Sequence, residues 1–327
     1  MLKRFKVVVS DHDFPDLSIE KSILEPIGAE VIGAQCKTGG KSLLKFVKDA
    51  DAILQQYAEI RADVIEELEK CKVIARYGIG VDILDLEACK RKGIIVTNVP
   101  YYCVNEVADH AISMALMLIR RIPMYWKAVR EGKWHWSASG APIHRIEGQV
   151  FGLIGFGKIA RNIARKVKAF GFQVWAYDPY VHEFFMKEEG VRKVEFEEII
   201  KESDVLCLQV PLNEKTHHMI GEKELKMMKN SAILINTSRG PLVDNKALYK
   251  ALVEGWIAAA ALDDLEEEPA KKEKWNPENN PLLSLENCVV TPHSAYYSEE
   301  SIEEARRTAA EEVRSVLLGQ APRYRVV

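Results

Sequence analysis

Three polar residue types that could act on a carbonyl group each follow an apolar run in the second half of the chain. Arg239 follows one such run, the acidic stretch 263–268 follows the next, and His293 follows a third. We interpret each apolar run as a buried strand of a parallel sheet. Because ligands bind at the carboxyl ends of such strands, we expect these side chains to approach one cleft.

Together these residue types suit the reduction of a ketone that neighbours a carboxylate. A guanidinium can bind a carboxylate through two parallel hydrogen bonds. An imidazolium can give its proton to the carbonyl oxygen while a hydride reaches the carbon, and a neighbouring carboxylate orients the imidazole and favours its charged form. Taken singly, each has an ordinary alternative: a solvated arginine, a solvated acidic face and a structural histidine. Spacing alone does not select one glutamate of the acidic stretch.

A glycine-rich turn supplies the matching cofactor signal. Gly155, Gly157 and Ala160 form a G-x-G-x-x-A pattern between a strand pattern and a helix pattern. Such a turn brings the backbone and a helix N-terminus close to the pyrophosphate of a dinucleotide.

An acid at the end of the next predicted strand extends this signal. Asp178 lies 21 residues after Gly157, where a carboxylate accepts hydrogen bonds from the adenosine ribose of NAD and repels the 2′-phosphate of NADP. The alternative is a turn aspartate before Pro179. With the glycines at this spacing, we predict an NAD site.

The elements that position these residues fall into two series of alternating strands and helices, which is typical of α/β proteins with parallel sheets. The first series predicts strands Phe5–Ser10, Ala29–Gly33, Ala52–Leu54, Val73–Ala75 and Ile94–Thr97, with helices that include Ala62–Lys70 and Leu84–Lys92. A long helix is predicted over Val104–Arg121, and 126–147 is interpreted as a loop with aromatic anchors.

The second series starts near Gln149. It predicts strands Val150–Ile154, Gln173–Tyr177, Val205–Val210, Ala232–Asn236, Ile257–Leu262 and Cys288–Thr291. Its predicted helices are Lys158–Phe170, Glu222–Met228, Asn245–Glu254 and Glu299–Leu318, and 266–286 is predicted to be a loop.

Composition narrows the class of protein. The 327 residues favour two domains, and 45 basic against 48 acidic residues give a net charge of −3, which argues against nucleic acid or anionic membrane as a partner. No apolar run has the length of a membrane span or a signal peptide, so we expect a cytoplasmic protein. The six cysteines show no C-x-x-C spacing, so no metal site is expected, and Cys207 and Cys288 are interpreted as core residues.

Ordered motifs along nearly the whole chain resemble the D-isomer-specific 2-hydroxyacid dehydrogenase family. The matching runs are 76–82, 98–100, the glycine-rich turn, 210–216, 236–240, 261–263 with Glu268-Pro269, and 291–293. The resemblance implies two Rossmann-like, doubly wound parallel-sheet domains with a cleft between them. A substrate-binding, flavodoxin-like domain would comprise residues 1–100 and 297–327. An NAD-binding Rossmann domain would comprise 101–296 and form a homodimer, with 126–147 as a candidate dimer surface.

The resemblance also implies roles for individual residues. Arg239, Glu268 and His293 would be catalytic, with Glu268 as the partner that keeps His293 protonated. Glu268 is selected from the acidic stretch because the family glutamate stands directly before the proline. Substrate would be bound by Arg76, Gly78, Ile79, Gly80 and Tyr296. The cofactor would be bound by Val107, Gly155, Phe156, Gly157, Lys158, Ile159, Asp178, Val210, Pro211, Thr216, Thr237, Ser238, Arg239, Asp263 and His293.

Within the family the chain resembles the C-terminal binding protein group most closely, through 177–180, His217-His218 and 292–299. Three residues depart from the pattern: Tyr296 stands where that group usually has tryptophan, Asp109 where glutamate is usual, and Asp264 where valine is common. We therefore expect an NAD-dependent dehydrogenase that interconverts a small 2-oxo acid and a D-2-hydroxy acid, with His293 as acid and base. The alternative is an NAD(H)-sensing dimeric scaffold of the C-terminal binding protein type.

Overall fold

Each series of strands forms its own parallel sheet in the computed structural model, which describes residues 5–272 and 274–327. The chain divides into two units. The first contains Met1–Cys103, Ala270–Lys274 and Tyr297–Val327, and the second contains Val104–Pro269 and Trp275–Tyr296. Compared with the predicted domain boundaries, 101–103 and the short segment 270–274 group with the first unit.

The first unit is built on five parallel strands. They are β1 (Phe5–Val9), β2 (Ala29–Gly33), β3 (Ala52–Gln55), β4 (Val73–Arg76) and β5 (Ile95–Thr97). Their order in the sheet is β2-β1-β3-β4-β5, the flavodoxin-like order that the resemblance implied. The central strands are almost fully buried, because helices cover both faces of the sheet.

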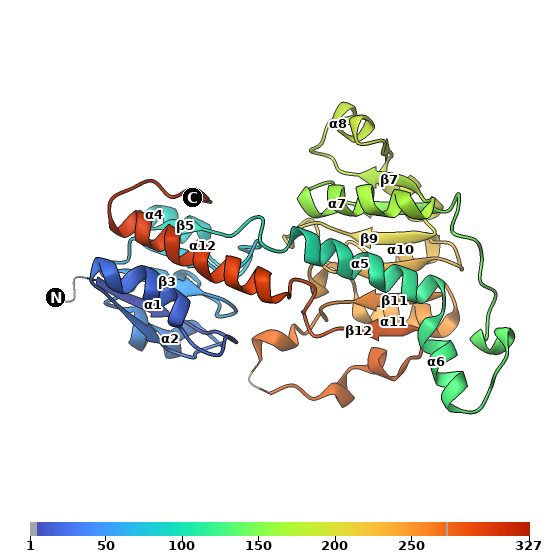
Figure 1. The fold of residues 1–327 in the computed structure, drawn as a ribbon, viewed down its shortest axis with the longest axis horizontal. Coiled ribbons are helices and arrows are strands. Elements are labelled where there is room, and N and C mark those ends of the chain that lie inside the picture. The colour runs from blue at the N-terminus through green and yellow to red at the C-terminus, as the bar shows by residue number, and fades with distance from the viewer. Residues whose placement is uncertain (1–4, 273) are drawn as a thin grey trace. The chain divides into compact units, whose positions relative to one another are not determined.

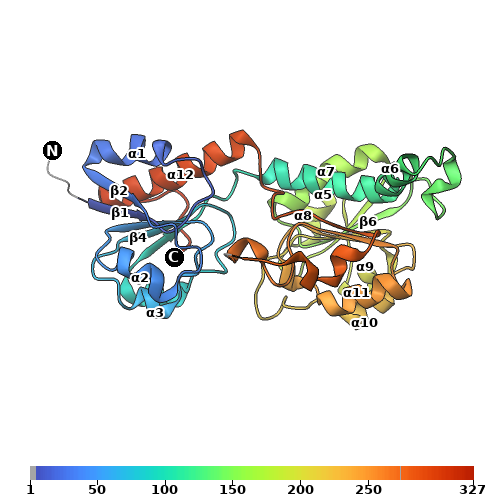
Figure 2. The ribbon, with the colours of Figure 1, turned by 90° about the horizontal axis from the view of Figure 1, so that it is seen from below.

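Those helices are α1 (Ser18–Leu24), α2 (Gly40–Val47), α3 (Ala62–Ile65), α4 (Leu86–Lys92) and α12 (Glu299–Leu317). Figure 2 shows α1 and α12 on one face of this sheet and α2 and α3 on the other. The predicted helix Ala62–Lys70 is wrong beyond Ile65, because the Glu69 N–H donates to the carbonyl of Lys48 at 2.9 Å instead of extending the helix. Helix α4 begins two residues later than predicted, after Asp85 accepts the N–H of Ala88.

A buried ion pair ties three parts of this unit together. Arg306 of α12 donates to both carboxylate oxygens of Glu20 in α1, at 2.9 and 2.7 Å. The Tyr77 hydroxyl, in the turn after β4, donates to the same carboxylate at 3.1 Å. Burial, followed by the charge of Glu20, raises the pKa of Tyr77 well above its usual range, so the phenol remains a neutral donor. The pair therefore anchors the turn 76–80 to two helices.

The second unit is built on seven parallel strands. They are β6 (Val150–Ile154), β7 (Gln173–Tyr177), β8 (Arg192–Lys193), β9 (Val205–Leu208), β10 (Ile233–Asn236), β11 (Ala259–Leu262) and β12 (Cys288–Val290). Their order is β12-β11-β10-β9-β6-β7-β8. The chain thus winds in opposite directions from β6, and the switch point lies between β6 and β9, where a Rossmann fold binds its dinucleotide. Cys207 and Cys288 are buried, as predicted.

Helices also cover both faces of the second sheet. They are α5 (Val104–Ile119), α6 (Ile122–Arg130), α7 (Lys158–Val167), α8 (Glu183–Glu188), α9 (Phe196–Glu202), α10 (Glu222–Met227) and α11 (Asn245–Glu254). Figure 1 shows α5 and α7 running side by side, and Figure 2 shows α9, α10 and α11 on the opposite face. Short 3-10 helices occupy Glu25–Ile27, Trp136–Ser139, Lys168–Phe170, Gly240–Leu242, Pro269–Lys271, Pro277–Asn279 and Pro281–Ser284.

The interpretation of 126–147 as a loop with aromatic anchors is wrong in two respects. Helix α6 starts at Ile122, with Pro123 in its first turn, where proline favours a helix start. The helix continues to Arg130, so 126–130 is helical. In addition, Trp126, Trp134 and Trp136 are 63%, 86% and 78% exposed, so they do not anchor the segment in the core. In the described part of the chain, no helix is long and apolar enough to cross a membrane.

Candidate active site

The glycine-rich turn between β6 and α7 has the shape that a dinucleotide requires. Gly155 has φ 91°, and a Cβ there would lie 2.3 Å from the carbonyl oxygen of Gln209, so only glycine fits this crossing at the switch point. A Cβ at Gly157 would meet no heavy atom within 4 Å. Gly157 is the N-cap of α7 and provides no side chain to bond the first N–H groups of the helix. Open space and a helix N-terminus together fit a pyrophosphate.

Asp178 is held at the edge of this turn. One carboxylate oxygen accepts the N–H of Phe156 at 2.8 Å, and the other accepts the N–H of Tyr180 at 2.8 Å. Each carboxylate oxygen has a second lone pair, so the oriented carboxylate retains capacity to accept ribose hydroxyls. These residues therefore fit NAD.

The other predicted cofactor residues lie either on or beside helices α5 and α7, or in the loops after β9 and β10. Val107 on α5 and the Phe156 side chain are buried, whereas Lys158 and Ile159 lie in the first turn of α7. The loops after β9 and β10, which carry Val210, Pro211, Thr216, Thr237 and Ser238, are tied to each other. Gln209 donates to the Thr237 hydroxyl at 2.7 Å, and the Ser238 hydroxyl donates to the carbonyl of Leu208 at 2.9 Å.

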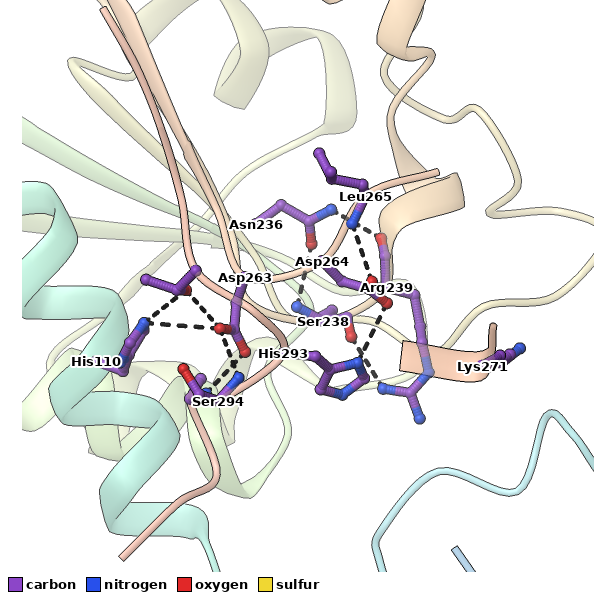
Figure 3. A network of polar contacts seen from close by, with 12 residues as sticks. His110, Asn236, Ser238, Arg239, Asp263, Asp264, Leu265, Lys271, His293 and Ser294 are labelled. Carbon is purple, nitrogen blue, oxygen red and sulfur yellow. Dashed lines mark hydrogen bonds and ion pairs between the residues drawn. The ribbon is translucent and has the colours of Figure 1, made fainter. Parts of the chain in front are cut away.

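The loop after β10 also presents Arg239. Asn236 donates to the carbonyl of Arg239 at 2.7 Å and accepts the N–H of Ser238 at 3.1 Å, which fixes the turn. The Arg239 side chain is half-buried, and one guanidinium nitrogen donates to the Ser238 carbonyl at 2.9 Å. Figure 3 shows this guanidinium beside the His293 ring.

Gly240 allows this turn to pack against the acidic loop. A Cβ at Gly240 would lie 2.0 Å from the carbonyl oxygen of Leu265. We expect Gly240→Ala to displace 265–266, to lower stability by about 1–3 kcal/mol through overpacking and to lower turnover as well. Thermal unfolding and steady-state assays measure both effects. Gly221→Ala is the matched control, since a Cβ there would meet atoms only at 3.6 and 3.8 Å. Equal effects of the two substitutions would contradict this role for Gly240.

Asp263 holds the turn that carries His293. Its buried carboxylate accepts the Thr291 hydroxyl at 2.5 Å and the N–H groups of Ser294 and Ala295 at 2.9 and 2.8 Å. Its backbone carbonyl accepts the N–H of His293 at 2.7 Å. The Asp263 carboxylate therefore shapes the histidine turn, whereas the sequence predicted a cofactor contact.

The His293 ring faces a carboxylate that sequence reasoning did not assign. Its Nδ1 lies 3.3 Å from Oδ2 of Asp264, which is 6% exposed. Glu268, the predicted partner, lies in the same acidic loop and is half-buried. Both His293 and Glu268 have left-handed backbones, with φ 55° and 47°. Such backbone strain in non-glycine residues is common at functional sites. In the sequence, the feature that could have indicated this contact was Asp264 itself, which stands where valine is common.

The predicted substrate residues lie on two loops. Tyr296 belongs to the histidine turn, and its ring centroid lies 6.1 Å from that of His293. In the first unit, Arg76 donates to the carbonyls of Gln56, Tyr77 and Gly80 and so shapes its own loop. Within the described residues, the structure gives no protein acceptor for the N–H groups of Ile79 and Gly80.

Comparisons with known proteins identify the family of this chain. A family model described as "D-isomer specific 2-hydroxyacid dehydrogenase, NAD binding domain" matches residues 112–295. The glyoxylate reductase of Korarchaeum cryptofilum is 41% identical over 285 residues, which cover 86% of this chain and 84% of that protein. The D-3-phosphoglycerate dehydrogenase of Methanocaldococcus jannaschii is 39% identical over 96% of this chain, which spans 58% of that longer protein.

A solved structure extends the agreement to the whole fold. D-lactate dehydrogenase from Aquifex aeolicus, complexed with NAD and lactic acid, superimposes with a TM-score of 0.88 at 30% identity, covering 98% of this chain and 99% of that one. The finer resemblance to C-terminal binding proteins stays a prediction. The chain belongs to the D-isomer-specific 2-hydroxyacid dehydrogenase family and is an NAD-dependent oxidoreductase of that family.

Proposed function

We propose that the chain reduces a small 2-oxo acid to the D-2-hydroxy acid, or catalyses the reverse reaction, with His293 as the acid–base group. The observation that carries this proposal is the His293 ring, which lies against the Asp264 carboxylate at 3.3 Å and beside the Arg239 guanidinium (Figure 3). Bound NAD(H) supplies or accepts the hydride. The protein must therefore bind the acid, orient its carbonyl and move one proton.

Binding of the substrate carboxylate is assigned to two groups. Arg239 can form two parallel hydrogen bonds to a carboxylate or to the adjacent carbonyl. The N–H groups of Ile79 and Gly80 are further donors, and successive N–H groups in a turn favour anions. Arg76 supports this loop through its bonds to backbone carbonyls. Tyr296, next to His293, is assigned to the substrate side chain.

Proton transfer is assigned to His293. During reduction the charged imidazole donates its proton to the oxygen of the carbonyl, which stabilises the negative charge that develops there. In the reverse direction the neutral ring accepts the proton of the hydroxyl. Glu268 is proposed as a further carboxylate of this machinery, on the strength of the family motif alone.

The proposal is tested by following NADH oxidation with a panel of 2-oxo acids that includes glyoxylate, hydroxypyruvate and pyruvate. The named relatives make glyoxylate the first choice. NADPH is run in parallel, and we expect lower activity with it, because Asp178 would repel the 2′-phosphate. Turnover with NADPH at least equal to that with NADH would contradict the role of Asp178.

Binding of NADH without turnover on any acid would overturn the proposal and favour the dimeric scaffold that senses NAD(H). A homodimer formed through the second unit and a cytoplasmic location stay predictions from the sequence. Size-exclusion chromatography with light scattering tests the dimer directly.

A further inference from the structure

Two adjacent aspartates at the end of β11 act on the histidine turn in different ways. The Asp263 carboxylate bonds to the hydroxyl and backbone of the turn 291–295. The Asp264 carboxylate instead accepts the N–H of Leu265 on Oδ1 at 2.9 Å and faces the His293 ring with Oδ2. Figure 3 shows the Asp264 side chain between Leu265 and His293.

We propose that Asp264 is the positioning residue that fixes the orientation and the tautomer of His293 through Nδ1. This inference rests on the proposed function, in which the other ring nitrogen exchanges a proton with the substrate. No role for this residue follows from the family motif, where valine is common.

Burial makes the contact specific. Asp264 is 6% exposed, and a buried carboxylate is stable only where hydrogen bonds or an opposite charge replace its water. The Leu265 N–H holds one oxygen and thereby orients the other toward Nδ1. A carboxylate only accepts hydrogen bonds, so it favours the ring tautomer with a proton on Nδ1. In addition to Asp264, Figure 3 shows the Arg239 guanidinium beside the ring.

This tautomer leaves Nε2 as the working nitrogen. In reduction, the N–H bond at Nε2 breaks and its proton forms an O–H bond on the substrate, whose carbonyl carbon would receive the hydride that bound NADH would supply. The product ring is neutral and keeps the proton on Nδ1, bonded to Asp264. In oxidation, the free lone pair of Nε2 accepts the hydroxyl proton. Both directions therefore need the proton on Nδ1.

Asp264→Asn tests the inference with little change in shape. The amide oxygen can still accept the Leu265 N–H, which turns the amide NH₂ toward Nδ1. That group favours a lone pair on Nδ1 and places the proton on Nε2, where it blocks acceptance of the substrate proton. We expect kcat for hydroxy-acid oxidation to fall by about 10²–10⁴-fold, the range for loss of general acid–base catalysis, while the Kd for NADH is retained. An aspartate-to-asparagine change in a serine-protease triad, which also leaves the histidine in the wrong tautomer, costs about 10⁴-fold.

The direct readout is nitrogen NMR of histidine-labelled protein, with His293→Ala to assign the ring signals. We expect the neutral ring to carry its proton on Nδ1 in the unmodified chain and on Nε2 in Asp264→Asn. This measurement needs no turnover. Failure of every 2-oxo acid to react would contradict the proposed function. An unchanged His293 tautomer in Asp264→Asn would instead contradict the role of Asp264.

Two matched variants complete the design. Glu267→Gln makes the same carboxylate-to-amide change in the same loop, at a side chain that bonds Trp275 and Asn280, and is expected to leave kcat and the tautomer unchanged. Glu268→Gln tests the rival carboxylate, and a tautomer change there but not in Asp264→Asn would overturn the inference. If Asp264→Asn does not fold, Asp264→Val serves instead. The inference would also be overturned if Asp264→Val kept the wild-type kcat and the neutral His293 ring kept its proton on Nδ1.

Discussion

Replacing His293 with alanine is expected to lower turnover by about 10²–10⁴-fold, the range for loss of a general acid–base group. The methyl group can neither donate a proton to the carbonyl oxygen nor take one from the hydroxyl. The Kd for NADH should stay close to that of the unmodified chain, because the glycine-rich turn and Asp178 lie on the loops after β6 and β7. Stopped-flow or steady-state absorbance gives the rate, and NADH fluorescence gives the affinity.

His144→Ala is the control for this substitution, since it removes an exposed imidazole from the same unit. It should leave turnover unchanged. Unchanged turnover in His293→Ala would remove His293 from the mechanism. A parallel loss of NADH binding and thermal stability would instead show that the substitution damages the fold of the turn 291–295.

Replacing Arg306 with alanine is expected to lower the free energy of unfolding by about 3–5 kcal/mol, the usual cost of removing one partner from a buried ion pair. Glu20 is fully buried, and Arg306 is only 5% exposed. Without the guanidinium, the Glu20 carboxylate would keep only the Tyr77 hydroxyl among the partners described above. Urea unfolding of the full chain, followed by circular dichroism, measures the loss.

Arg307→Ala provides a matched control one residue further along α12. Arg307 pairs with Glu303 at 2.7 Å, but both side chains are at least half exposed. We expect a loss of no more than about 0.5 kcal/mol, the range for exposed pairs four residues apart. Similar losses in the two variants would show that burial does not govern the Arg306–Glu20 pair.

The cofactor half of the site could be predicted from the sequence because its signals are local. Gly155, Gly157 and Ala160 lie within six residues, and the preceding strand and following helix were confirmed as β6 and α7. Short apolar runs likewise identified most strands, because strands buried on both faces are nearly continuous in hydrophobicity. Short elements such as β8 and α8 carry too few residues for a clear pattern, and neither was predicted.

The partner of His293 could not be predicted in this way. Asp264 and His293 are 29 residues apart, and the acidic loop offered several carboxylates at similar spacing. Which one reaches the ring depends on the direction in which each side chain leaves the loop. That direction is set by the end of β11 and by the Leu265 N–H, which holds Oδ1 of Asp264.

The sequence by itself determined the fold class, the family, the NAD-binding turn and the residue types of the site. These properties follow from periodicity and from motifs in which the interacting groups are close along the chain. The tertiary structure alone decided the exposure of the three tryptophans, the Arg306–Glu20 anchor and the contact of Asp264 with His293. Each of these depends on packing between segments distant in the sequence, where a side chain's neighbours are fixed only when the strands and helices come together.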